Sequence, residues 1–261
     1  MTTTLVLGMP RSGTSLVTHM LDRMGLKTDI PPHNGIDGFY KASHRFLQHL
    51  DVHQYLMNLP NIHSFALLQK PPRDIHVLKD ILRQKKIVKE PYLLSVLPFI
   101  KDEIKNIVLV IRNPNEVLES SRDFIKENPQ STARLSLKDW HWYYETFVRV
   151  MSVSSIPFTV VVYKDLLTNP KYVAETLAQF LHLDQAIEYD FIQAQKRTVP
   201  LLNIPVQTMY LFTSLINQVS TKDILLRLEI LIKNNTGVNC ACFCGSTKKY
   251  KKCCGKPNQP E

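Results

Sequence analysis

A short segment near the N-terminus, residues 4–24, most constrains the fold of this chain. An apolar run over residues 4–7 predicts a buried strand, and a glycine-bounded loop follows it over residues 8–15. Apolar side chains then recur at helical spacing over residues 16–24, and Gly25 ends the pattern. A strand, a glycine loop and a helix in this order direct backbone N–H groups at a phosphate. The sequence therefore predicts a phosphate-binding loop after the first strand.

The side chains of this loop differ from those of a Walker A motif, G-x-x-x-x-G-K-[ST]. The spacing of Gly8 and Gly13 fits, but Thr14 stands where Walker A has the lysine that reaches the outer phosphates of a triphosphate. Arg11 carries the positive charge of the loop instead. The loop therefore argues against ATP. The residues that we predict to bind the ligand are Pro10, Arg11, Ser12, Gly13, Thr14 and Ser15.

A second phosphate site is predicted farther along the chain. Residues 106–111 form a continuous apolar run, which is typical of a strand in a parallel sheet. Arg112 follows this run directly, and an Asn-Pro turn leads into a predicted helix that carries Ser120. A guanidinium at a strand end and a hydroxyl on the next helix can bind one phosphate together.

These two segments resemble the nucleotide-binding segments of sulfotransferases, which use 3′-phosphoadenosine 5′-phosphosulfate (PAPS). Pro-Arg-Ser-Gly-Thr-Ser is similar to their 5′-phosphosulfate loop, and Arg112 with Ser120 resembles their 3′-phosphate site. The resemblance covers residues 5–183 and is strongest to simple bacterial sulfotransferases. It implies an α/β fold with three layers, in which a P-loop-like parallel sheet is flanked by helices. It also implies transfer of a sulfuryl group from PAPS to a hydroxyl or amine on a small-molecule or glycan acceptor.

The strand end at residues 86–91 supplies candidate catalytic groups. Lys89 matches the lysine of the Lys-Thr-His-Leu-Pro strand end in cytosolic sulfotransferases, so the resemblance implies that Lys89 acts with Arg11 on the transferring group. The histidine base of that motif is replaced here by Pro91. The base is therefore open among four candidates, in this order: Glu90, His44, Asp37 and His33.

Two other functions stay open on the sequence. A P-loop kinase or NTPase would need Mg²⁺ and a triphosphate, and Thr14 in the lysine position speaks against it. A non-catalytic nucleotide-binding protein would keep both phosphate sites and lack a base.

All five cysteines lie near the C-terminus, between Cys240 and Cys254, which favours a local metal site over a disulfide framework. Four of them form two close pairs around a basic loop, and two such pairs can surround one tetrahedral Zn²⁺. The segment resembles the SEC-C motif of the SecA translocase motor, with Thr247 in place of a glycine. The resemblance implies a zinc knuckle that docks to another macromolecule. The predicted zinc ligands are Cys242, Cys244, Cys253 and Cys254.

Three segments are thus predicted: a sulfotransferase domain over residues 1–200, a helical extension over residues 201–236 and the zinc motif over residues 237–261. The net charge of +9 suits a nucleotide with several phosphates. Nucleic acid is not the expected partner, because basic and aromatic residues are not interleaved. No apolar run reaches membrane-spanning length. The first strand begins almost at Met1, which leaves no room for a signal peptide, so we expect a cytoplasmic location.

Overall fold

The computed structural model of the chain describes residues 2–28, 49–60, 62–129, 134–183 and 204–235. The chain divides into two compact units. The sheet unit is drawn from residues 1–112 and 154–197, and the helical unit from residues 113–153 and 198–261. The predicted zinc motif lies outside the described residues, and the predicted segment boundaries stay a prediction.

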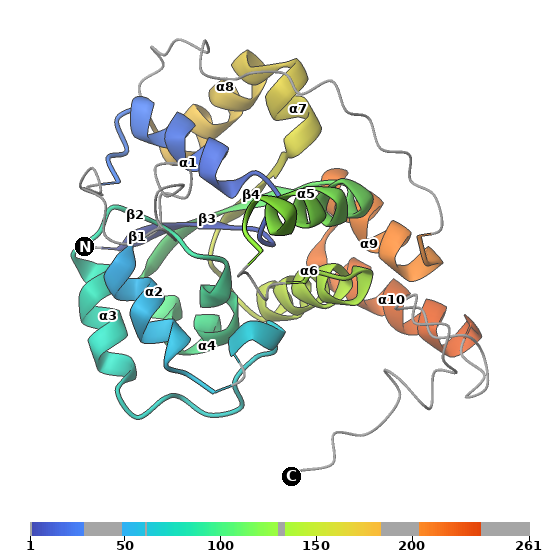
Figure 1. Cartoon of the computed structure of the whole chain (residues 1–261), viewed down its shortest axis with the longest axis horizontal. Coiled ribbons are helices and arrows are strands. Elements are labelled where there is room, and N and C mark those ends of the chain that lie inside the picture. Colours follow the sequence, from blue (N-terminus) through green and yellow to red (C-terminus); the bar gives the residue numbers. More distant parts are fainter. Residues whose placement is uncertain (1, 29–48, 61, 130–133, 184–203, 236–261) are drawn as a thin grey trace. The chain divides into compact units, whose positions relative to one another are not determined.

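A four-stranded parallel sheet with the strand order β2-β1-β3-β4 forms the centre of the sheet unit (Figure 1). Its strands are β1 (Thr3–Leu7), β2 (Ile87–Lys89), β3 (Ile104–Ile111) and β4 (Phe158–Val162). Every residue of β1 is buried, as expected for a parallel strand with both faces covered. β1, β2 and β3 lie where the sequence predicts strands. β3 begins two residues before the predicted start, because the exposed Lys105 interrupts its apolar pattern.

Helices cover both faces of this sheet. Figure 1 shows α1, α7 and α8 on one face and α2, α3 and α4 on the other, which confirms the predicted parallel sheet flanked by helices. The helices of the sheet unit are α1 (Thr14–Arg23), α2 (Leu50–Met57), α3 (Ile75–Arg83), α4 (Leu97–Ile100), α7 (Tyr163–Thr168) and α8 (Pro170–Leu181). Short 3₁₀ segments add η2 (Ile62–Ser64), η3 (Pro91–Val96) and η4 (Lys101–Glu103).

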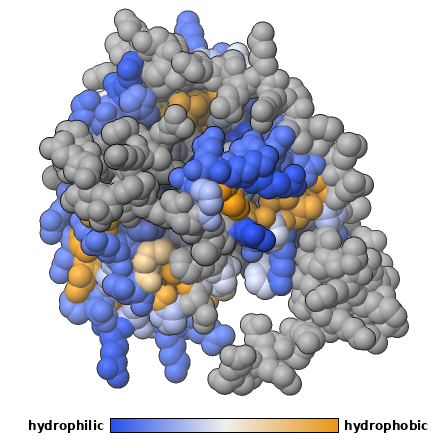
Figure 2. Space-filling model, in the orientation of Figure 1, coloured by the Kyte–Doolittle hydropathy of each residue, from blue (hydrophilic) through white to orange (hydrophobic). Residues whose placement is uncertain are grey.

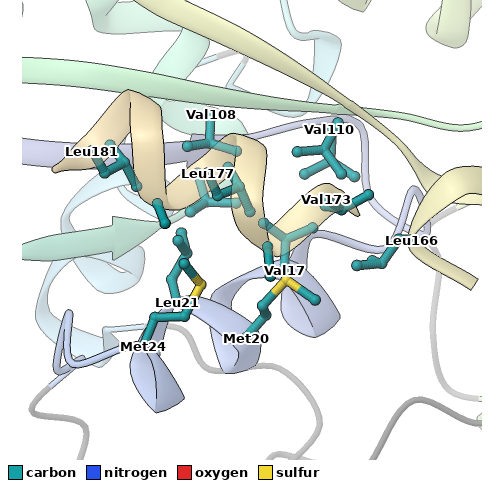
Figure 3. Packing of buried hydrophobic residues seen from close by; sticks show 14 of the residues in the cluster. Val17, Met20, Leu21, Met24, Val108, Val110, Leu166, Val173, Leu177 and Leu181 are labelled. Carbon is teal, nitrogen blue, oxygen red and sulfur yellow. The ribbon is translucent and has the colours of Figure 1, made fainter. Parts of the chain in front are cut away.

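Apolar packing fixes α1 against the sheet (Figure 3). Val17, Met20 and Leu21 of α1 are fully buried in a cluster with Val108 and Val110 of β3. α8 adds Val173, Leu177 and Leu181 to the same cluster. Because β1 and α1 are both held in this way, the loop that joins them has its two ends fixed by the core.

The C-terminal end of α1 has the predicted glycine stop. Gly25 has a φ of 94°, which favours glycine. The N–H of Leu26 donates to the carbonyl of Leu21 at 3.0 Å, and the N–H of Gly25 donates to that of Asp22 at 3.1 Å. These two bonds form a Schellman-type cap that satisfies the last carbonyls of the helix.

The helical unit consists of helices in its described part. They are α5 (Pro114–Glu127), α6 (Leu137–Ser152), α9 (Val206–Ile216) and α10 (Thr221–Asn235). A capping box of Ser136 and Asp139 starts α6. Its fully buried aromatic side chains are Trp140, Tyr143, Tyr144 and Phe147. In its described part, the helical extension predicted over residues 201–236 forms two helices, because the chain turns after Asn217, where Gln218 adopts a φ of 52°.

Within the described ranges, none of the helices combines the length and the apolar character needed to cross a membrane. On the face drawn in Figure 2, hydrophobic residues lie in separate groups among hydrophilic ones. Such a mixture is ordinary for a folded chain, whose surface keeps many apolar atoms.

Candidate functional site

The carboxyl ends of the four strands bring the site residues of the sheet unit to one edge. β1 runs into the loop at Gly8, β2 ends at Lys89, β3 is followed by Arg112 and β4 by Tyr163. Lys89 pairs with Val6 in the parallel register, so it lies beside the start of the loop. Ligands of open α/β sheets bind at this edge.

The two glycines of the loop are required by close contacts. A Cβ on Gly13 would lie 2.3 Å from Cδ2 of Tyr163, and a Cβ on Gly8 would lie 2.6 Å from the carbonyl oxygen of Val110. Gly13 also has a φ of 99°. Any side chain at either position would push the loop away from the sheet edge, so the glycines keep the loop backbone close to it.

Ser12 gives the loop an unsatisfied buried hydroxyl. Its side chain is fully buried, and its Oγ has no hydrogen-bond partner among the described residues. Its N–H donates to the carbonyl of Met9 at 3.0 Å, which closes the turn. An unpartnered buried hydroxyl is costly, and a phosphate oxygen is an acceptor that would satisfy it. Arg11 precedes it with a φ of 72°, a left-handed conformation that costs a non-glycine residue about 1–3 kcal/mol.

Arg112 is held against the loop by two contacts. Its Nη1 donates to the carbonyl oxygen of Arg11 at 3.2 Å, and its Cζ lies 4.2 Å from the centroid of the Tyr163 ring. The same ring covers Gly13. The sequence assigned no site role to Tyr163, which follows β4 directly, as Arg112 follows β3. The structure thus brings the two arginines and Tyr163 together at the loop.

Lys89 is a buried cation beside this loop. Only 3% of its surface is exposed. Burial lowers the pKa of the Lys89 ammonium to about 8, against the opposing effect of Glu90, and the charge of Arg11 lowers it further. The ammonium is therefore mostly charged at pH 7. A buried cation with a second, partly exposed cation nearby favours an anionic ligand.

Glu90 is a buried carboxylate that contacts His53 and a backbone N–H. Its Oε2 lies 2.9 Å from Nδ1 of His53 on α2, and its Oε1 accepts from the N–H of Tyr92 at 3.3 Å. The Glu90 side chain is 1% exposed and that of His53 25%. Sequence reasoning placed His53 in a helical segment without a role, because no local spacing relates it to Glu90.

The other predicted site residues lie in the helical unit or outside the described residues. Ser120 lies on α5, in the helical unit. His33, Asp37 and His44 lie outside the described residues, as do the four predicted zinc ligands, Cys242, Cys244, Cys253 and Cys254. Within the part of the chain that the structure describes, no group of three or more His, Cys, Asp or Glu side chains could hold a metal ion.

Comparison with protein families gives a match over most of the chain: the sulfotransferase domain matches residues 1–209. A search of curated proteins found no match. Among solved structures, the sulfotransferase domain of the Synechococcus PCC 7002 olefin synthase is 18% identical, with a TM-score of 0.45 over 88% of this chain and 94% of that one. A sulfotransferase from Alicyclobacillus acidocaldarius is 16% identical, with a TM-score of 0.44 over 89% and 96%. The sulfotransferase domain of the curacin biosynthetic pathway is 15% identical, with a TM-score of 0.44 over 72% and 76%.

Proposed function

Because the chain belongs to the sulfotransferase domain family, we propose that it transfers a sulfuryl group from PAPS to a hydroxyl or amine of a small-molecule or glycan acceptor. The observation that carries this proposal is the sheet edge at which Ser12, Lys89 and Arg112 follow three parallel strands. It offers an unpartnered buried hydroxyl, a buried ammonium and an oriented guanidinium to one anionic ligand.

The loop is the proposed site of the 5′-phosphosulfate. Its backbone N–H groups precede α1, and the N-terminus of a helix favours a phosphate. The proposed ligands are the loop residues Pro10, Arg11, Ser12, Gly13, Thr14 and Ser15. Arg112 is proposed to bind the 3′-phosphate, and Ser120 keeps its role there as a prediction from the sequence.

Lys89 is proposed to act on the transferring group. In sulfuryl transfer, the acceptor attacks sulfur while charge builds on the sulfuryl oxygens and on the departing phosphate. Preorganised cations that meet this charge lower the barrier. Lys89 is already buried and mostly charged at pH 7, so little reorganisation is needed at the moment of reaction.

Calorimetry on the full chain tests this function against the two alternatives. We expect PAPS and its product, 3′,5′-ADP, to bind without Mg²⁺, and ATP to bind weakly with or without it. Tight binding of ATP with Mg²⁺ would instead indicate a P-loop kinase or NTPase. Binding of PAPS without transfer to any acceptor, including water, would indicate a non-catalytic binding protein.

We also propose one structural Zn²⁺ on Cys242, Cys244, Cys253 and Cys254, with a docking role toward a protein partner. The support is the sequence pattern of two cysteine pairs with the spacing of tetrahedral zinc sites. Elemental analysis of protein purified under reducing conditions should find about one zinc per chain, and Cys253→Ser should lose it. Zinc content near zero in the wild-type protein would refute this proposal without affecting the proposed nucleotide site.

A further inference from the structure

His53 and Glu90 form a pair between two elements that are far apart in the sequence. His53 lies on α2, and Glu90 follows β2 directly. The 2.9 Å distance between Nδ1 of His53 and Oε2 of Glu90 is that of a charge-assisted hydrogen bond. The Glu90 carboxylate is buried, whereas the His53 imidazole is partly exposed to solvent.

Glu90 is held in place from both sides. Besides the contact with His53, its Oε1 accepts from the N–H of Tyr92 and caps η3. A carboxylate that is fixed and buried in this way is poorly placed to take a proton from an incoming acceptor. It is well placed to orient the imidazole, because it accepts the Nδ1 proton and leaves the lone pair on Nε2.

Glu90 of this pair directly follows Lys89, which is proposed to act on the transferring group. Lys89 pairs with Val6, two residues before the loop begins. The electrostatic influence of Arg11 on Lys89 shows that the loop cation is close to this strand end. Among the described residues, no hydrogen-bond partner occupies Nε2 of His53.

We propose that His53 is the general base of the reaction and that Glu90 is its positioning residue. This inference rests on the proposed function. The acceptor hydroxyl gives its proton to Nε2 of His53 while its oxygen forms the new bond to sulfur. The bond between sulfur and the 5′-phosphate oxygen of PAPS breaks, and its electron pair leaves with 3′,5′-ADP. Glu90, the first candidate base on the sequence, thereby takes the orienting role.

The test measures release of 3′,5′-ADP from PAPS by the full chain, with three acceptors: water, phenol and 4-nitrophenol. His53→Gln keeps an amide that can reach Glu90 but cannot act as a base. We expect it to lower kcat by about 10²- to 10⁴-fold with water and phenol. With 4-nitrophenol, which ionises readily, we expect a loss of less than about tenfold, because an ionised acceptor needs no base.

Two further variants separate catalysis from structure. Asp51→Asn breaks another ion pair of α2, between Asp51 and Lys85 at 2.8 Å, and should leave kcat unchanged with all three acceptors. His53→Ala should regain activity when imidazole is added, whereas Asp51→Asn should not respond. For Glu90→Gln we expect a smaller loss of kcat than for His53→Gln. We also expect ¹⁵N NMR to show that the His53 proton shifts from Nδ1 toward Nε2, a change that a purely structural role would not produce.

Calorimetry with PAPS on each variant makes the outcomes distinguishable. Failure of the wild-type protein to bind PAPS would refute the proposed function itself. Equal losses with phenol and 4-nitrophenol in His53→Gln, with PAPS binding intact, would overturn the assignment of His53 alone. A Glu90→Gln variant that is inactive while His53→Gln keeps its full rate would identify Glu90 as the base and overturn the proposal as well.

Discussion

The two units of the molecule differ in how their surroundings treat a buried charge: burial disfavours the charge of Lys89 in the sheet unit, and charged neighbours favour that of Glu145 in the helical unit. In the sheet unit, Ser12 has a buried hydroxyl with no partner among the described residues, and burial lowers the pKa of the Lys89 ammonium to about 8. In the helical unit, Nδ1 of the buried His141 lies 3.1 Å from the Thr208 hydroxyl, and its Nε2 lies 3.1 Å from Glu145 without hydrogen-bond geometry. Glu145 also pairs with Arg149.

Under the proposed function, this difference separates groups that bind the nucleotide from groups that stabilise the fold. Burial of a charged or unsatisfied polar group destabilises a folded chain, and the lowered pKa of Lys89 indicates that its burial disfavours the charged form. In the helical unit the partners favour the charged form of the carboxylate: His141 and then Arg149 lower the pKa of Glu145 to about 2, although burial alone would raise it. The same kind of polar burial therefore predicts opposite effects of mutation in the two units.

The largest expected effect is on Lys89→Met. We expect kcat for 3′,5′-ADP release to fall about 10²- to 10³-fold, because the transition state loses a preorganised cation. The free energy of unfolding at pH 7 should rise by about 1–3 kcal/mol, because a buried charge is removed. Thermal unfolding and steady-state kinetics measure the two effects. Lys86→Met, at an exposed position just before β2, is the control and should change neither.

The sign of the Lys89 effect can be checked on the wild-type protein. The pKa is about 8 in the folded chain and 10.5 in its ordinary environment. The unfolded chain therefore binds more protons between these values, and stability should rise with pH across this window. A melting temperature that is lower in Lys89→Met than in the wild type would break the comparison between the units.

The second prediction concerns Glu145→Gln in the helical unit. We expect a loss of about 2–3 kcal/mol in the free energy of unfolding at pH 7, because the neutral amide replaces the paired carboxylate. The pKa of Glu145 is depressed from 4.5 to about 2, so its stabilisation is present above pH 4.5 and is lost as the pH falls toward 2. Urea unfolding at pH 7 and at pH 2.5 should show a difference between variant and wild type that shrinks in acid. A difference that is equal at both pH values would contradict the pairing.

The third prediction tests whether Arg112 of the sheet unit binds the 3′-phosphate. Arg112→Ala should weaken binding of 3′,5′-ADP by about 1.5–3 kcal/mol, the scale of a charged hydrogen bond. Binding of adenosine 5′-phosphosulfate, which has no 3′-phosphate, should barely change. Calorimetry with both nucleotides measures this. Equal losses would instead indicate that Arg112 acts by holding the loop through its bond to the carbonyl of Arg11.

The smallest expected effect is the uptake of protons when the nucleotide binds. An anion bound beside Lys89 stabilises the ammonium and raises its pKa above about 8. Binding of 3′,5′-ADP at pH 8 should then take up about half a proton per chain. Calorimetry in buffers with different ionisation enthalpies gives this number, and Lys89→Met should show no uptake. Proton release by the wild type would place the bound anion away from Lys89.

Much of the sheet unit could be predicted from the sequence, because its strands are short apolar runs and its site residues follow them directly. β1, β3 and Lys89 are examples. The helix α7 was missed, since its six residues begin immediately after β4 and precede an Asn-Pro pair that reads as a turn. His53 could not be predicted, because its relation to Glu90 exists only across the fold. The register of β2 against β1, which places Lys89 beside the loop, is likewise set by packing.

The two tryptophans of the chain, Trp140 and Trp142, both lie on α6 in the helical unit. Fluorescence excited selectively in tryptophan therefore reports on the helical unit and not on the sheet unit. Trp140 is fully buried beside Tyr144, so its emission should shift to longer wavelength when the helical unit opens. Thermal unfolding can therefore be monitored in two ways that report on different parts of the molecule: by this emission and by the release of a bound nucleotide. Two separate midpoints would show that the units unfold independently.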